Sequence, residues 1–421
     1  MKITYIGISH LSIIYGLSSA LKNHNILFVE TDDYDLNLYK NGNFPFFEKE
    51  LLEVYEKVRS NVLFTKNLNE IVDSDLIFIS KDIKKLDEQN WDYDEINLLI
   101  SKIYPFLINK IPVIIQSQSF PGYIRNLREN WKIDFIYFVE TLIIGNSFEN
   151  ALSPSRTIIG KVQDSFLLPD SFKEFLKSFD TQVIETTYET AELIKIAVNV
   201  YLIFDVTATN LLSSIGATHK IDWEKLVYAL RLDPRIGINR YLSPGFGISG
   251  GNLERDLKAI INLGSNANLP IRDLIENINR FSEYNKIWPF QKFLEFLDKK
   301  KTSQNILIIG LGYKSGTSST INSPSIKLVE SLNTLKLNIN LNLIFFDENN
   351  SDYLTDNFAL KLSKLNLDDD LNFDFIFYMY HSEKNAKILN KAISSSYQPI
   401  VIGKELNFLI EARQKCILIN K

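Results

Sequence analysis

The sequence contains very little sulfur and very little histidine. Among its 421 residues there are one cysteine, two methionines and four histidines. A single cysteine excludes an internal disulfide framework and a cysteine-based metal site within one chain. The histidines are far apart and show no H-x-x-x-H spacing, so we expect no metal centre; they are His10, His24, His219 and His381. Cys416 lies in a short apolar run, where we expect a small buried residue.

Long hydrophobic runs and an excess of basic charge are also missing. No apolar run approaches the roughly 18 residues that a membrane-spanning helix needs, so we expect no membrane association. The chain opens as a strand pattern without an apolar signal segment, which predicts a cytoplasmic protein. The net charge is -5, and lysine and arginine are scattered among acidic residues rather than gathered in a stripe. This distribution excludes a nucleic-acid-binding protein.

Two stretches of the chain have the pattern of a parallel sheet covered by helices. Up to about residue 185, short apolar runs alternate with segments of helical period, in the order KITYIG, NILFVE, SDLIFIS, PVIIQSQ, IDFIYFVE and SRTIIG. The same rhythm returns after a charged linker at 298–305, with NILIIG, NLIFFD, FDFIFYMY and QPIVIG. Apolar strands separated by helices indicate sheets buried on both faces.

Between these stretches the sequence is helical. The run TAELIKIAVNVYLIFDVTATNLLSSIGA keeps apolar residues at helical spacing for more than 25 residues. Because such a helix is apolar on several sides, we expect a partner to cover it, as in the core of a homodimer. We predict an α/β protein with two Rossmann-like, doubly wound parallel-sheet domains, residues 1–185 and 300–421. A long-helix dimerisation and catalytic domain, residues 186–299, joins them.

The first predicted strand ends at a turn where a dinucleotide fingerprint, G-x-G-x-x-G, would stand. Gly7 can make the tight turn, but Ser9 and Ser12 hold the places of the second and third glycines. Serine is small and can donate to a phosphate, so we expect a weakened cofactor site. Glu30 lies where a carboxylate binds a ribose diol and disfavours a 2'-phosphate, which predicts NAD. The alternative is a sheet that keeps this topology without a cofactor.

A second glycine-rich turn follows the first strand of the C-terminal stretch. It runs from Gly310 to Thr317 and contains one lysine, Lys314. Backbone donors freed by glycine, together with one cation, suit a diphosphate, so we predict that a nucleotide binds here. An ordinary glycine-rich turn is the alternative.

Several blocks, in the right order, resemble the UDP-glucose/GDP-mannose dehydrogenase family over almost the whole chain. They are VETLIIG with SPSRTIIG, AELIKIAVN in the long helix, LDPRIG, PGFGISGGNLERD, and GLGYKSGT followed by SP. The resemblance implies NAD-dependent oxidation of the C6 hydroxymethyl group of a nucleotide-linked hexose, in two hydride steps. It also implies a role in polysaccharide precursor synthesis. A UDP-hexose is favoured because the block around Lys314 looks more like that of UDP-sugar members.

The resemblance also implies roles for individual residues. Lys195 and Asn199 would flank the C6 oxygen from one face of the helix, since they are spaced i, i+4. Glu140 would act in acid/base chemistry, and Asp256 would assist water in the hydrolytic step. Cofactor-binding positions would be Gly7, Ser9, Ser12, Glu30, Ser117 and Gln118. Substrate-binding positions would be Arg235, which reaches the neighbouring subunit's sugar, with Gly247, Gly250 and Lys314.

The chain departs from the family pattern at the catalytic position. Asn252 stands where the family has the cysteine whose thiolate attacks the intermediate aldehyde, and an amide cannot form that bond. Other departures are Arg255 for a lysine, Ser249 for a glycine, Gln118 for a threonine and Ile321 for an arginine. Two hypotheses follow. One is an oxidoreductase that stops at the aldehyde, diverts from it, or makes acid slowly through a hydrate; the other is a non-catalytic nucleotide-sugar-binding protein or partner subunit.

Overall fold

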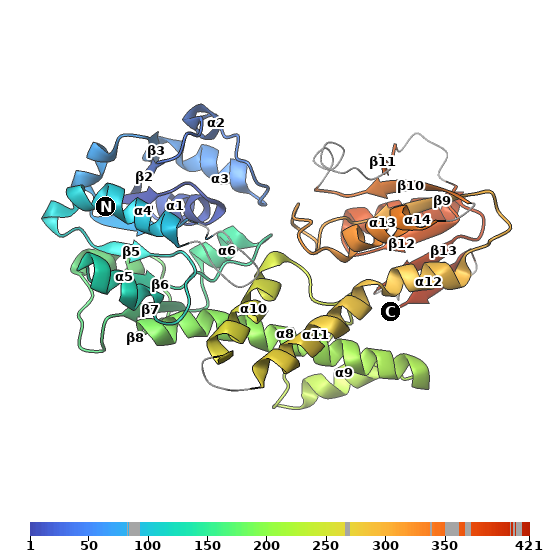
Figure 1. Cartoon of the computed structure of the whole chain (residues 1–421). Helices are drawn as coiled ribbons and strands as arrows, with labels where there is room; N and C mark the ends of the chain where they lie inside the picture. The colour runs from blue at the N-terminus through green and yellow to red at the C-terminus, as the bar shows by residue number, and fades with distance from the viewer. Residues whose placement is uncertain are drawn as a thin grey trace. The chain divides into compact units, whose positions relative to one another are not determined.

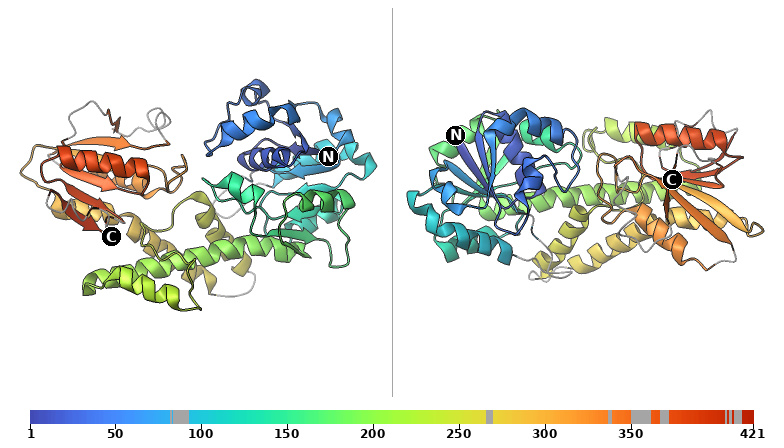
Figure 2. Two further views of the ribbon diagram at one scale, coloured as in Figure 1. Left: turned by 180° about the vertical axis from the view of Figure 1, so that it is seen from behind. Right: turned by 90° about the horizontal axis from the view of Figure 1, so that it is seen from above.

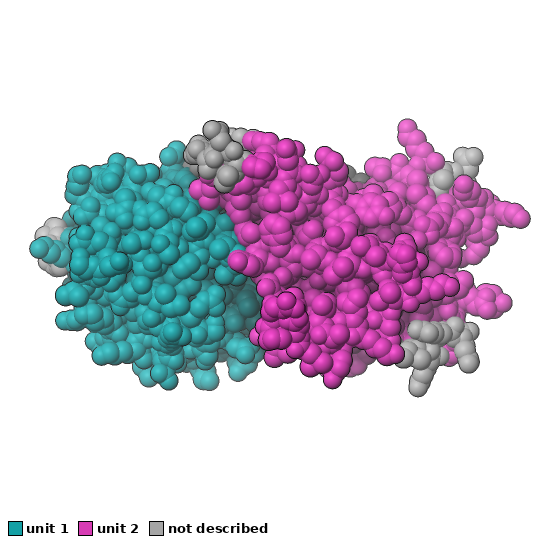
Figure 3. Space-filling model, turned by 90° about the horizontal axis from the view of Figure 1, so that it is seen from below, with its two compact units in different colours: residues 1–198 teal, residues 199–421 magenta. Residues whose placement is uncertain are grey.

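The computed structural model describes most of the chain (Figure 1). The described residues are 1–81, 83, 93–265, 270–336, 339–349, 362–366, 372–404, 406, 409 and 415–421. They form two compact units, residues 1–198 and 199–421, coloured teal and magenta in Figure 3. Each unit contains one β-sheet.

The sheet of the first unit has the strand order β3-β2-β1-β4-β5-β6-β7-β8. Its strands are β1 (Lys2–Ile6), β2 (Asn25–Val29), β3 (Val62–Thr65), β4 (Leu76–Ile79), β5 (Val113–Ile115), β6 (Ile136–Phe138), β7 (Thr157–Lys161) and β8 (Val183–Thr187). Neighbouring strands are parallel except β6 and β7, which are antiparallel. All six runs predicted in this stretch are strands, and β3 and β8 are additional.

Helices flank this sheet, as the views in Figure 2 show. They are α1 (His10–Leu21), α2 (Leu36–Lys40), α3 (Leu51–Val58), α4 (Asp94–Ile103), α5 (Tyr123–Trp131), α6 (Ser147–Leu152) and α7 (Asp170–Lys177), with 3-10 turns at Arg59–Asn61, Leu68–Asp73 and Tyr104–Asn109. Alternate residues of β1 pack into two different cores, because successive side chains of a strand point to opposite faces.

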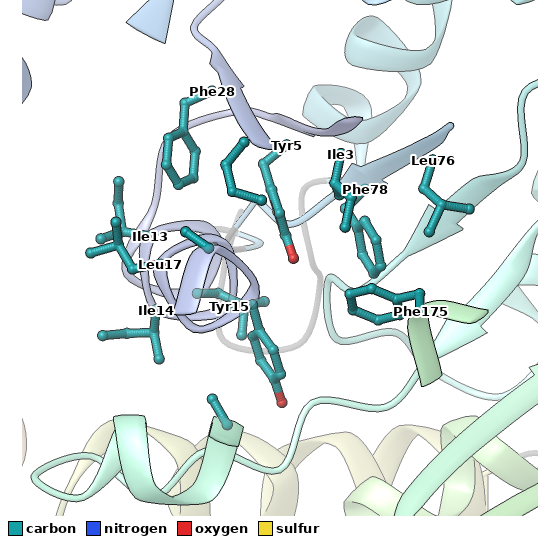
Figure 4. Close-up of a cluster of buried hydrophobic side chains, with 14 of the residues drawn as sticks. Ile3, Tyr5, Ile13, Ile14, Tyr15, Leu17, Phe28, Leu76, Phe78 and Phe175 are labelled. Atoms are coloured by element: carbon teal, nitrogen blue, oxygen red, sulfur yellow. The ribbon is translucent and has the colours of Figure 1, made fainter. Parts of the chain in front are cut away.

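One of these cores lies between the sheet and α1. Tyr5 of β1 is fully buried there and stacks on Phe78 of β4, with 4.9 Å between ring centroids. Ile13 and Leu17 of α1 pack in the same cluster (Figure 4). Ile6 belongs instead to the cluster on the other face, which contains α4 and α5 residues. The packing of α1 fixes the turn between β1 and α1, where the predicted cofactor site lies.

A single long helix, α8 (Tyr188–His219), carries the chain from the first unit into the second. The second unit continues with α9 (Trp223–Leu232), α10 (Gly251–Ser265), α11 (Ile271–Lys286) and α12 (Trp288–Phe296). Ile203 of α8 and Leu257 of α10 are fully buried in one small core with Ile275 and Ile278 of α11. This core holds α10, and with it Asn252 and Asp256, against α8.

The second sheet has the order β11-β10-β9-β12-β13-β14, and all of its pairs are parallel. Its strands are β9 (Ser303–Ile309), β10 (Asn340–Phe346), β11 (Ser363–Lys364), β12 (Phe375–Tyr378), β13 (Ile400–Gly403) and β14 (Ile417–Asn420). Ile306 and Ile308 pack toward α13 (Pro324–Thr334), whereas Leu307 and Ile309 pack toward α14 (Glu383–Ser395). Two α/β sheets and a long helix confirm the predicted fold class.

Three sequence expectations concern features that the structure describes directly. Cys416 is a buried free cysteine, as predicted. Among the residues described, no helix combines the length and the apolar character needed to cross a membrane. Within the same residues, no group of three or more His, Cys, Asp or Glu side chains is arranged to hold a metal ion.

Candidate functional site

The turn between β1 and α1 requires a glycine. Gly7 has φ +80°, and a Cβ added there would lie 3.1 Å from Cδ of Lys81. Its amide donates to the carbonyl oxygen of Val29, which joins the turn to β2. The positive φ of Gly7 allows a tight turn directly after β1, as in a dinucleotide-binding turn.

The two serines of the fingerprint form the amino-terminal cap of α1. Ser9 Oγ accepts from the amide of Ser12 at 3.2 Å, and Ser12 Oγ accepts from the amide of Ser9 at 2.7 Å. The Ser9 hydroxyl donates to the carbonyl oxygen of Ser80 at 2.6 Å, and the Ser12 hydroxyl to that of Ser9. Sequence analysis assigned these hydroxyls to a phosphate, but here both donate to protein carbonyls.

Glu30 lies at the end of β2, where the sequence placed it, and is 1% exposed. One carboxylate oxygen accepts from the amides of Thr31 and Asp32, at 2.8 and 3.1 Å, and the other accepts from Ile8 at 3.2 Å. The carboxylate thus holds the turn in place. A positive-φ glycine, the amino end of a helix and a carboxylate on the next strand fit the adenosine-diphosphate half of NAD.

Lys81, which sequence analysis missed, lies beside this turn. Its ammonium pairs with Asp32 at 2.9 Å and with Glu95 at 3.2 Å. Burial opposes its charge, but the hydrogen bond to Asp32 and the nearby Glu30 and Glu95 carboxylates outweigh burial and raise the pKa of Lys81. It is a fixed cation at the edge of the predicted cofactor site.

The loop after β5 contains Ser117 and Gln118, and a buried carboxylate holds it. Glu192 of α8 accepts from the Ser119 hydroxyl and from the amides of Gly122 and Ile124, at 3.0, 2.7 and 2.9 Å. Burial outweighs these three donors and raises the pKa of Glu192 to about 7. Sequence analysis did not assign Glu192 a role, although a glutamate among the apolar residues of the helix was a usable signal.

Within the first unit, Lys195 of α8 is paired with Glu140. Its Nζ lies 2.5 Å from Oε1 of the glutamate, and the two side chains are 13% and 14% exposed. Glu140 follows β6 by two residues, and its other oxygen accepts from the amide of Leu142 at 3.1 Å. The fold thus joins an acid and a base that are 55 positions apart in the sequence.

The segment after Glu140 is held by a second buried glutamate, Glu48. It accepts from the amide and hydroxyl of Ser147, at 3.1 and 2.9 Å, and contacts His10 Nε2 at 3.1 Å. Burial opposes its charge, but the hydrogen bonds from His10 and Ser147 keep the pKa of Glu48 below its usual value. Glu48 therefore links the start of α1 to the loop that carries Glu140.

Two of the three remaining predicted catalytic residues, Asn199 and Asp256, pair within the second unit. Asn199 Nδ2 donates to Asp256 Oδ2 at 2.5 Å, and Arg255 Nε donates to Oδ1 at 2.9 Å. Asp256 is fully buried, whereas Asn252, one turn earlier on α10, is exposed. Lys195 and Asn199 are one turn apart on α8, and the division between the units falls between them.

The glycine-rich segment before α10 packs against the C-terminal Rossmann-like turn. Gly250 has φ +80°, and a Cβ there would lie 2.9 Å from Cε2 of Tyr313. At Gly247, φ is +88° and a Cβ would lie 2.5 Å from the carbonyl oxygen of Ser282. The segment cannot hold larger residues at these two positions without shifting.

The second turn repeats the arrangement of the first. The amides of Leu311 and Gly312 donate to Oδ2 of Asp347, at the end of β10, at 2.6 and 3.0 Å. Sequence analysis did not identify Asp347. The ammonium of Lys314 lies 5.7 Å from the ring centre of Tyr313, so it remains near the turn that the sequence assigned to a diphosphate.

Arg235, a predicted substrate-binding residue, follows α9. Its side chain is 86% exposed and pairs with Asp233 at 2.7 Å. The hydrogen bonds from Arg235 lower the pKa of the Asp233 carboxyl. The residues that the structure describes therefore leave this guanidinium exposed.

Two family models match the chain in sequence. Residues 1–180 match the NAD binding domain of the UDP-glucose/GDP-mannose dehydrogenase family, and residues 189–284 match its central domain. The chain belongs to this family. Membership confirms the resemblance described above, the NAD cofactor and the expectation of an NAD-dependent oxidoreductase.

Individual relatives agree with the family. UDP-glucose 6-dehydrogenase TuaD of Bacillus subtilis is 24% identical over 345 residues, 79% of this chain and 74% of that protein. UDP-glucose 6-dehydrogenase of Rickettsia conorii is 26% identical over 343 residues, 79% of this chain and 78% of that protein. Among solved structures, a UDP-glucose dehydrogenase from Pyrobaculum islandicum superposes with a TM-score of 0.81 at 18% identity, covering 99% of this chain and 96% of that one. At 18% identity, this structural similarity supports the fold and nothing beyond it.

Proposed function

We propose that this family member oxidises the C6 hydroxymethyl group of a UDP-linked hexose with NAD, and that the aldehyde or its hydrate is the main product. The observation that carries the proposal is the Lys195–Glu140 pair, 2.5 Å apart and mostly buried. A desolvated ammonium beside a carboxylate supplies both the charge stabilisation and the proton acceptor that alcohol oxidation needs.

The first oxidation uses groups that this chain retains. NAD, when bound, would supply the acceptor for the hydride that leaves C6. The hydroxyl proton must leave as the C=O bond forms, and Glu140 is the carboxylate proposed to accept it through Lys195. The ammonium of Lys195 stabilises negative charge on the C6 oxygen. Asn199 donates its amide hydrogen to Asp256, so its carbonyl oxygen remains to orient the C6 hydroxyl.

The second oxidation differs from that of the family. An Asn252 amide does not add to an aldehyde, so no thiohemiacetal forms and no thioester follows. Water can add to the aldehyde to give a hydrate, which a second NAD can oxidise to the acid. We expect this route to be slow, since Asp256 is already held by Asn199 and Arg255. An aldehyde released from the enzyme is also open to epimerisation.

We further propose a homodimer formed through α8 and α9. Large apolar side chains on these helices are exposed within one chain, namely Tyr201, Leu211, Ile215, Tyr228 and Leu232. Covering them requires a second copy of the helices. The exposed Arg235 would then reach the partner's substrate. The three-domain division at residues 185 and 299, a cytoplasmic location and a role in polysaccharide precursor synthesis belong to the same proposal.

One assay tests the reaction. The purified chain is mixed with NAD and a panel of UDP-hexoses and GDP-hexoses, NADH absorbance is followed, and products are identified by mass. One equivalent of NADH per sugar with an aldehyde is expected. Two equivalents with an acid would show that Asn252 is no obstacle.

A second candidate function is a binding protein or a partner subunit without catalysis. The observations that favour it are Asn252 and the serine hydroxyls of α1, which donate to protein carbonyls. If no sugar is turned over but one raises the melting temperature, this second function is supported.

A further inference from the structure

Three polar residues form a row at the carboxyl ends of β1, β4 and β5, which are neighbours in the sheet. They are Ser9, Ser80 and Gln116. The Ser9 hydroxyl donates to the Ser80 carbonyl oxygen at 2.6 Å, and the Ser80 hydroxyl donates to Gln116 Oε1 at 2.7 Å. In open α/β sheets, ligands bind outside the carboxyl ends of the strands where the strand order reverses, which is here between β1 and β4.

The last member of this row has an unused donor. Gln116 is fully buried, and its backbone amide donates to the carbonyl oxygen of Ile79 at 2.9 Å. Its side-chain Oε1 accepts from Ser80, but Nε2 has no hydrogen-bond partner among the described residues. Buried polar groups are nearly always paired, so an unpaired amide at a binding edge indicates an acceptor that arrives with a ligand.

The strand order shows which part of NAD this acceptor belongs to. Glu30 and the cap of α1 lie on the β2 and β1 side, where the adenosine ribose and the diphosphate bind. Gln116 directly follows β5, which is two strands from β1 in the opposite direction. A dinucleotide that crosses the sheet edge therefore presents its nicotinamide riboside to Gln116.

We propose that Gln116 is a cofactor-binding residue whose Nε2 donates to an acceptor oxygen on the nicotinamide-riboside half of NAD. Ser80 fixes the amide by donating to its oxygen, which directs the nitrogen toward the cofactor. This inference rests on the use of NAD in the proposed function, and it adds a specific contact to it.

The test measures NAD, NADH and ADP binding to the full chain by calorimetry, and the melting temperature of the free chain. ADP carries the adenosine and diphosphate but not the nicotinamide riboside. The Gln116→Met variant is expected to bind NAD and NADH about 10-fold more weakly, because one buried hydrogen bond is lost. ADP affinity is expected to stay unchanged. The melting temperature of the free variant is the folding control, because Gln116→Met removes the unpaired donor but also the Oε1 acceptor of the Ser80 hydroxyl.

Two further variants complete the design. Gln116→Glu keeps an acceptor for Ser80 but removes the amide donor, so it should also weaken NAD binding, and it covers the case in which Gln116→Met does not fold. Gln163→Met changes an exposed glutamine of the same unit and should leave every value unchanged.

Three outcomes would overturn the inference. Equal NAD affinity for the wild type and both Gln116 variants would overturn the proposed Gln116 contact but not the use of NAD. An equal loss of ADP and NAD affinity overturns the assignment to the nicotinamide riboside. Failure of the wild-type chain to bind NAD overturns the cofactor assignment as well.

Discussion

The ammonium nitrogen of Lys195 lies 2.5 Å from a carboxylate oxygen of Glu140, and both side chains are mostly buried. Lys195→Met and Glu140→Gln should each lower kcat by roughly 100-fold to 10,000-fold, the range for acid/base groups. Single-turnover NADH formation measures this. Lys292→Met, at a partly exposed lysine of α12, is the control. A kcat within a factor of three of wild type would remove this pair from the mechanism.

Asn252 controls how far oxidation proceeds in the proposed function. Asn252→Cys introduces a thiol one turn before Asp256 on α10, and we expect NADH production to rise from one toward two equivalents per sugar. Mass spectrometry of the product should show acid in place of aldehyde. Asn252→Ser, which adds a much weaker nucleophile, is the matched control. An unchanged product would mean that another departure, such as Gln118, limits the second step.

Glu192 makes stability depend on pH. Its pKa is raised from 4.5 to about 7, mainly by burial, so the folded chain binds this proton more tightly than the unfolded chain. Stability should therefore fall as pH rises from about 4.5 to about 7, by on the order of 3 kcal/mol from this group alone. Melting temperatures between these pH values should fall less steeply for Glu192→Gln. Glu174→Gln, at an exposed position of α7, should keep the wild-type slope.

Two features of the structure favour glycine at position 250: its positive φ and its close contact with Tyr313. Gly250→Ala places a Cβ 2.9 Å from the Tyr313 ring at φ +80°, and we expect about 1–3 kcal/mol of destabilisation. Gly245→Ala is the matched control, because a Cβ there meets no atom within 4 Å. Urea unfolding measures both. Equal stability of the two variants would show that the Gly250 segment can shift away from Tyr313.

If α8 forms the proposed dimer interface, a charged residue at Ile215 should disrupt the dimer. Its side chain is 49% exposed on α8 within one chain. Ile215→Asp would bury a charge in the proposed interface, so light scattering should show a monomer. Leu167→Asp, at a residue that is 81% exposed in the first unit, should leave the assembly unchanged. A wild-type monomer would contradict the homodimer directly.

The sequence predicted the central strands of both sheets but missed the outer ones. The four missed strands, β3, β8, β11 and β14, are the edges of the two sheets. An edge strand is covered less completely, so it does not need a continuous apolar run. The residues of β8, for example, are all partly or fully exposed. β3 (VLFT) and β14 (ILIN) do contain short apolar runs that were not recognised as strands, whereas β11 (SK) has none.

The site was predicted where its residues share a local pattern and missed where it depends on long-range contacts. Lys195 and Asn199 were named from the family resemblance, and their i, i+4 spacing placed both on one face of the helix; Gly7 and Glu30 were named from the first turn and the next strand. Glu192 contacts a loop about 70 positions earlier in the chain. Asp347 holds a turn 36 positions away. No spacing rule connects such residues, so only the folded chain shows what they do.

The serine cap of α1 also affects the thermodynamics of phosphate binding at the amino end of this helix. Because Ser9 and Ser12 satisfy each other's backbone amides, the first turn of the helix is formed before any phosphate arrives. Association then exchanges one partner of an amide for another and does not have to order a loose loop. The entropic penalty of NAD association should be correspondingly small, and its enthalpy modest.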